Sequence, residues 1–129
     1  MPNSKLVSLI KEDLDGWNRW RGENPDAEVD LSGADFERAD LAVCDLSGAN
    51  LRGASLIMAN LKAADLRGAD LSSANLVGAR MIGVDLVNAD LSGADLRTAE
   101  DLTPEQIAET KGDSATQLPD YLEKPASWS

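Results

Sequence analysis

Residues 29–53 read VDLSG ADFER ADLAV CDLSG ANLRG, and the same five-residue unit continues without interruption to residue 98. In each of the fourteen units the third position holds a large apolar residue and the first holds a small one. The large residues are Leu31, Phe36, Leu41, Leu46, Leu51, Leu56, Leu61, Leu66, Leu71, Leu76, Met81, Leu86, Leu91 and Leu96. A repeat of this regularity indicates the architecture of the chain.

A period of five fits neither an α-helix nor a continuous strand. On a helix this step winds the large residues around the axis, so they form no apolar face. On a strand the step is odd, so alternate large residues would face water. Within one unit, however, the small and the large residue point to the same side if three residues are extended and two turn a corner. The period therefore predicts short extended segments joined by corners, with both apolar residues directed inward.

The corner chemistry agrees with this prediction, because seven units end in glycine and most large residues follow Asp or Asn. The repeat resembles that of the pentapeptide repeat family over Val29 to Thr98. This resemblance implies an all-β solenoid, a right-handed quadrilateral β-helix in which four units form one coil. At the family's twenty residues per coil, the chain would hold about 3.5 coils in a shaft about 17 Å tall. The flanks also look like those of small bacterial members.

Both ends of such a solenoid need caps, because an open coil would expose leucines and unpaired backbone groups. Four apolar residues recur at helical spacing before the repeat: Leu6, Ile10, Leu14 and Trp17. They predict a helix over roughly residues 4–21 in an N-terminal cap of residues 1–28. Thr103 and Gln106 form a capping-box pattern, which predicts a short helix followed by a tail within residues 99–129.

Composition indicates one soluble domain of residues 1–129. No apolar run approaches the ~20 residues of a membrane span, and the first residues lack the pattern of a secretory signal. We therefore expect a cytoplasmic protein with no membrane association. The lone cysteine, Cys44, occupies a small-residue position of the repeat and is predicted to be an inert buried thiol.

The side chains offer little for catalysis. The chain contains no histidine, and its glycines recur with the repeat instead of forming a phosphate-binding loop. We predict that it is not an enzyme and uses no cofactor. Asp45, Asp65 and Asp85 should stack in a column that could hold calcium. The favoured alternative is that each carboxylate hydrogen-bonds to its own corner, so no metal site is predicted.

The net charge of −11 argues against direct binding of nucleic acid. It also raises an alternative, because some pentapeptide repeat proteins resemble B-DNA in girth and charge and inhibit DNA gyrase, a type II topoisomerase. The repeat of this chain carries ten acidic and six basic residues, a net charge of −4. A duplex about 17 Å long carries about ten negative charges. DNA mimicry is therefore the second hypothesis, not the first.

The first hypothesis is a non-catalytic scaffold or protein-interaction module whose partner is an unidentified protein. Four apolar residues occupy outward or corner positions and form the candidate interaction patch: Ile57, Met58, Val77 and Ile82. Such a patch is either covered or bound. We favour cover by Leu118, Tyr121, Leu122 or Trp128 of the tail over a dimer or partner site. The chain is accordingly expected to be a monomer or a weak homodimer.

Overall fold

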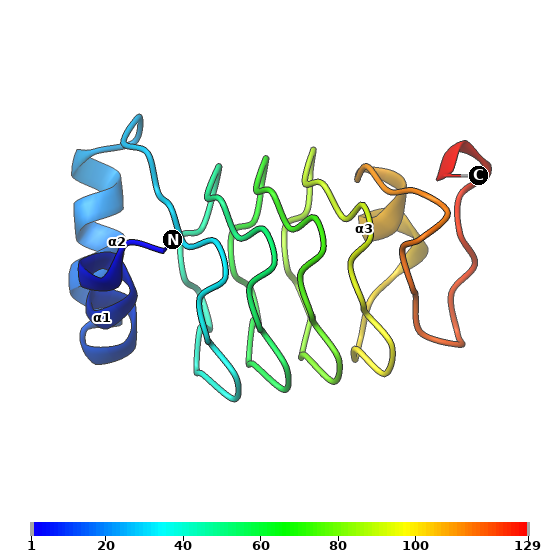
Figure 1. Cartoon of the computed structure of the whole chain (residues 1–129), viewed down its shortest axis with the longest axis horizontal. Helices are drawn as coiled ribbons and strands as arrows, with labels where there is room; N and C mark the ends of the chain where they lie inside the picture. Colours follow the sequence, from blue (N-terminus) through cyan, green and yellow to red (C-terminus); the bar gives the residue numbers. More distant parts are fainter. Residues whose placement is uncertain (1, 129) are drawn as a thin grey trace.

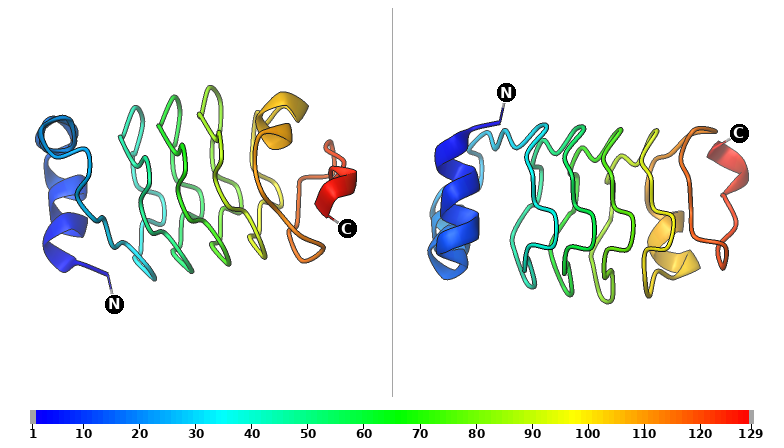
Figure 2. Two further views of the ribbon diagram at one scale, coloured as in Figure 1. Left: turned by 90° about the horizontal axis from the view of Figure 1, so that it is seen from above. Right: turned by 60° about the horizontal axis from the view of Figure 1, so that its bottom comes forward.

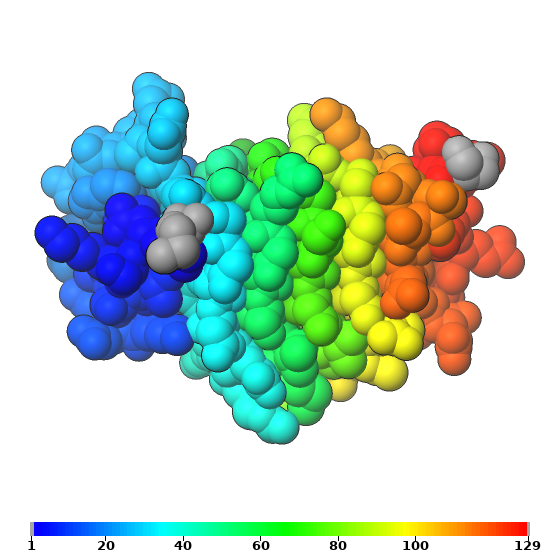
Figure 3. Space-filling model, viewed as in Figure 1, coloured from blue at the N-terminus to red at the C-terminus, as the bar shows by residue number. Residues whose placement is uncertain are grey.

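Backbone pairing follows the five-residue repeat through a stack of coils. The structure, a computed structural model, describes residues 2–128. Isolated parallel β-bridges join the second residue of each unit to its equivalent twenty residues later, from Asp30 with Asn50 to Arg80 with Glu100. Twenty residues therefore make one coil, and successive coils stack along a common axis (Figure 1). The space-filling view shows these coils in direct contact along the shaft (Figure 3).

A left-handed corner at every fifth residue divides each twenty-residue coil into four segments, here called the first to fourth faces. Figure 2 shows the stacked coils from two further directions. The first face comprises residues 29–33, 49–53, 69–73 and 89–93, the second 34–38, 54–58, 74–78 and 94–98, the third 39–43, 59–63 and 79–83, and the fourth 44–48, 64–68 and 84–88. Side chains on one face that are twenty residues apart therefore form a column.

The axis of the shaft is filled as the period predicts. Each of the fourteen large apolar residues is at most 2% exposed. The small residues are buried with them, except for Ala39, which is partly exposed. Both inward positions are thus confirmed, and the core is a set of parallel columns running the length of the repeat.

The fifth residue of every unit turns the corner in the left-handed region, with φ between 56° and 70°. In twelve of the fourteen units, the Asp or Asn at the second position accepts a hydrogen bond from the backbone N–H two residues later. The two exceptions are Ser55 and Arg80. The corners are thus fixed by backbone conformation and by local side-chain acceptors together.

Two helices lie across the N-terminal end of the shaft, α1 (Ser4–Glu12) and α2 (Leu14–Glu23) (Figure 1). The prediction of one helix over residues 4–21 is wrong, because the chain breaks at Asp13, with φ −149° and ψ 79°. There the Asp13 carboxylate accepts a hydrogen bond from the Gly16 N–H at 2.9 Å and caps α2. The break lets the apolar residues of both helices face the first coil.

The C-terminal end is more regular than the repeat suggested. Coil pairing continues beyond residue 98, with bridges from Asp90 to Lys111 and from Asp95 to Gln117. The extra residues of this last coil include helix α3 (Pro104–Ala108), which begins with the predicted capping box. The tail ends in a short 3₁₀ helix, η1 (Ala126–Trp128), and covers the end of the shaft.

Cys44 gives a prediction about pH. Burial, helped by the Asp45 carboxylate, raises the thiol pKa from its ordinary value of 9.0 to about 12. The folded state therefore favours the protonated thiol, and its stabilising effect is present below about pH 9 and is lost as the pH rises toward 12. We expect the stability of Cys44→Ala, measured by urea unfolding, to fall less between pH 8 and 10.5 than that of the wild type. Equal losses would contradict this.

Candidate protein-interaction surface

The structure divides the predicted patch between two faces. Ile57 and Val77 stack on the second face, where the Met58 N–H donates to the Val77 carbonyl oxygen at 2.9 Å. Both side chains occupy the predicted outward positions, but they are half-buried and not exposed. Ile82 lies on the third face, and Met58 lies at the edge between the two. Only Met58 and Ile82 therefore offer a large exposed apolar surface.

The third face gathers the exposed apolar side chains. Within residues 2–128, four large apolar side chains are exposed: Val43 (63%), Met58 (48%), Ile82 (48%) and Tyr121 (56%). Val43 and Met58 stand at the two edges of the third face, and Ile82 lies on it. Tyr121 adjoins Ile82, since both line one pocket with Leu102. Met58 and Ile82 belong to the predicted patch, whereas Val43 and Tyr121 were not predicted as surface sites.

Backbone strain is concentrated at the edges of the third face. Five of its seven left-handed corner positions hold residues other than glycine: Arg38, Val43, Met58, Ala63 and Thr98. At the other two edges only two of seven do, Ser73 and Asn88. A left-handed conformation is unfavourable for side-chain-bearing residues and most unfavourable for a β-branched one such as Val43, at φ 56°. Strain retained in this way marks a candidate functional surface.

Positively charged side chains lie on the third face, Lys62 and Arg80, and at its edge, Arg38. Among residues 2–128, Arg38, Lys62 and Arg80 form no ion pair, whereas Arg67 and Arg97 each contact a neighbouring aspartate at 2.7 Å. Those hydrogen-bonded pairs hold the pKa of Asp65 and Asp95 below its ordinary value.

Arg80 occupies the position that holds Asp or Asn in most units, so it cannot supply the usual side-chain acceptor at its corner. A groove of about 400 Å³ runs beside it. The groove is lined by Arg38, Asp40, Met58, Asn60, Gly78, Arg80 and Glu100.

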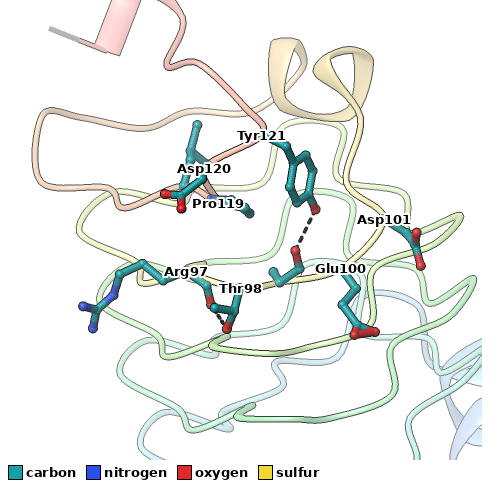
Figure 4. Close-up of a pocket in the computed structure, with 9 residues that line it drawn as sticks. Arg97, Thr98, Glu100, Asp101, Pro119, Asp120 and Tyr121 are labelled. Carbon is teal, nitrogen blue, oxygen red and sulfur yellow. Dashed lines mark hydrogen bonds between the residues drawn. The ribbon is translucent and has the colours of Figure 1, made fainter.

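The tail reaches only the rim of this surface. The Tyr121 hydroxyl donates to the Ala99 carbonyl oxygen at 2.6 Å and accepts from the Leu102 N–H at 3.1 Å. Figure 4 shows its ring beside Thr98 and Glu100 in a pocket of about 590 Å³. Leu118, Leu122 and Trp128 instead pack against the core at the end of the shaft. The favoured expectation that the tail covers the patch is therefore wrong for Met58 and Ile82, which stay exposed.

Other kinds of site find little support in the described part of the chain. Within residues 2–128, no three acidic or thiol side chains are arranged to hold a metal ion. The Asp45 carboxylate accepts from the N–H and the hydroxyl of Ser47, and that of Asp65 accepts from Arg67. No helix of the same residues has the length and apolar character of a membrane span.

Similar proteins share the repeat. The sequence profile described as pentapeptide repeats matches residues 27–68 and 64–99, with eight copies. A pentapeptide repeat protein from the thylakoid lumen of Arabidopsis thaliana is 35% identical, with a TM-score of 0.58 over 74% of this chain. This chain spans 63% of that protein. Rfr23, a pentapeptide repeat protein from the cyanobacterium Cyanothece 51142, is 30% identical, with a TM-score of 0.57 over 75% of this chain and 69% of its own.

A weaker similarity concerns QnrB1, a plasmid-mediated fluoroquinolone resistance protein. It is 25% identical over 66% of this chain and 58% of its own. The TM-score of 0.21 is too low to support a structural comparison. No curated protein matches the chain. The repeat profile covers more than half of the sequence, and the coil pairing follows the same period. The chain therefore belongs to the pentapeptide repeat family.

Proposed function

We propose that this protein is a non-catalytic scaffold, a right-handed quadrilateral β-helix capped at both ends, that binds another protein chain through its third face. One observation carries the proposal. The edges of this face keep Arg38, Val43 and Met58 in left-handed positions that glycine occupies at most other corners. Side chains held there at a conformational cost, around an exposed apolar surface, are typical of a contact surface.

A catalytic role has little chemical support. The chain contains no histidine, and burial keeps the Cys44 thiol protonated near neutral pH by raising its pKa to about 12. A buried neutral thiol is a poor nucleophile. The large pocket beside Tyr121 is lined by the carboxylates of Glu100, Asp101 and Asp120, and the two hydroxyls in its lining, those of Thr98 and Tyr121, donate to backbone carbonyl oxygens. Binding is the activity that these side chains support best.

DNA mimicry is supported less well than a scaffold role. A mimic needs a continuous negative surface, whereas the third face combines apolar side chains with Arg38, Lys62 and Arg80. On the second and fourth faces, the carboxylates of Asp65 and Asp95 are bound by arginines. We therefore propose no action on topoisomerases, and a gyrase supercoiling assay that showed salt-sensitive inhibition would favour the mimic instead.

The scaffold proposal can be tested by partner capture from native cell extract. We expect Ile82→Asp to reduce the captured partner at least about tenfold, because it replaces an exposed apolar side chain of the contact surface with a charge. The matched control is Val87→Asp, which makes the same kind of change on the fourth face. If Ile82→Asp and Val87→Asp both lost the partner, or if both retained it, binding through the third face would be contradicted.

A further inference from the structure

The third face is complementary to itself, and we infer that it binds a second copy of this chain with the two shafts antiparallel. The inference rests on the proposed function, in which this face is the contact surface, and it identifies the bound protein as a second copy of the chain. The side chains of this face form columns, which the β-bridges place in register at twenty-residue intervals.

Consider a two-fold axis that crosses the third face at Asn60. Asp40 bridges Asn60, and Asn60 bridges Arg80, so Asp40 and Arg80 lie one coil below and one coil above this axis. The rotation reverses the shaft but keeps each column facing its own copy. Asp40 then faces Arg80 of the second copy, and the same pair forms again on the other side of the axis.

The charges favour this register over its neighbour. Arg80 is exposed and, among residues 2–128, has no ion-pair partner within its own chain. A shift by one coil would place Asp40 opposite Glu100 of the second copy, because Arg80 bridges Glu100. Like charges in contact are strongly unfavourable at interfaces. A shift by one coil in the other direction would place Asp40 opposite Asn60 and leave Arg80 with no opposite residue in the column. The register centred on Asn60 is therefore the one that pairs Asp40 with Arg80.

The shape of one edge agrees with the same register. There Val43 faces Gly83 of the second copy, so the most exposed of the large apolar side chains meets a position with no side chain. Between the edges, Ala42 faces Ile82. At the other edge, Arg38 faces Gly78, over which the Met58 side chain of the same copy lies, and Met58 itself faces its own copy. Val43 and Ile82 are thus each opposite a small residue, as close packing of two identical surfaces favours.

Lys62 lies on the axis and faces its own copy, which opposes association. The contact is also short, since Asp40 and Arg80 are separated by two coil steps, about 10 Å. Interfaces with a small buried area are typical of weak complexes. The dimer is therefore expected to form at high protein concentration, and tests that trap it or compare variants are the most informative.

A cysteine on the two-fold axis tests the register directly in purified protein. We expect Lys62→Cys to form an intermolecular disulfide at least about tenfold faster than Arg52→Cys under mild oxidation, because residue 62 lies on the two-fold axis and meets its own copy, whereas residue 52 lies outside the contact. Arg52, like Lys62, is an exposed cation, but it lies on the first face. The native Cys44 is buried and adds no background. Equal rates for the two variants would overturn the inference.

Charge exchange tests the pairing, with sedimentation equilibrium as the measurement. Arg80→Asp and Asp40→Arg are each expected to weaken the dimer about 100-fold, since each change acts at two symmetric pairs. The double variant restores the opposite charges and should recover the wild-type affinity. Failure of the double variant to recover, with both proteins folded by circular dichroism, would contradict the antiparallel register.

The two proposals fail in different ways. If the purified protein neither cross-links at residue 62 nor dimerises, while Ile82→Asp still loses a partner from extract, the self-association is wrong and the scaffold proposal stands. If Ile82→Asp changes neither the dimer nor the captured partner, the third face is not a contact surface and both proposals fall.

Discussion

Replacing Trp17 with alanine is expected to lower the free energy of unfolding by about 3–5 kcal/mol, the range for a large buried aromatic residue. Trp17 is fully buried between α2 and the first coil. Its indole N–H donates to the Asp45 carbonyl oxygen at 2.8 Å, so truncation also leaves that acceptor without its partner. Urea unfolding followed by circular dichroism measures the change.

The matched control for this prediction is Trp20→Ala. Trp20 packs on Trp17 with ring centroids 5.4 Å apart, but it is half-buried, and within residues 2–128 its indole donates no hydrogen bond to the backbone of the repeat. We expect the loss of stability in Trp20→Ala to be smaller. Equal losses in the two variants would mean that burial in the α2 layer, and not attachment to the first coil, determines the effect.

Trp17 belongs to a group of α2 side chains that bind the exposed backbone of the first coil. The Asn18 side chain donates to the Val43 carbonyl oxygen at 3.0 Å and accepts from the Asp45 N–H at 2.8 Å. Arg21 donates to the Ser47 carbonyl oxygen at 2.8 Å. A coil at the end of a solenoid has no neighbour to pair with these groups. The helix supplies the missing partners, which explains why an apolar stripe alone would be an insufficient cap.

The repeat was predictable because its period constrains every unit in the same way. Fourteen leucine-like residues at one spacing leave a single arrangement in which all of them are buried. The ends were less predictable, because each depends on one local contact. The break between the two N-terminal helices depends on the hydrogen bond between Asp13 and Gly16. The β-bridge between Asp95 and Gln117 depends on how the irregular last coil runs. Neither leaves a periodic signal in the sequence.

The contact surface was predictable in part. The corner position of the repeat is read directly from the sequence, so Arg38 and Val43 could have been recognised as side chains held where glycine is usual. Tyr121 could not have been recognised in this way, because its position beside Ile82 depends on how the tail crosses the last coil. The half-burial of Ile57 and Val77 also needs the structure, because neighbours in a column cover one another about 4.8 Å apart.

Replacing Leu71 with alanine should lower the free energy of unfolding by about 3–5 kcal/mol. Leu71 is fully buried in the middle of the first-face column, between Leu51 and Leu91. In a solenoid each coil is stabilised by its two neighbours, so a cavity at this level weakens both interfaces. Ile82→Ala is the control, because its side chain is 48% exposed and its loss should cost about 1 kcal/mol or less. Urea unfolding of the two variants in parallel distinguishes them. If Leu71→Ala were no more destabilising than Ile82→Ala, the apolar columns would not be the main source of stability, and the caps would have to supply it.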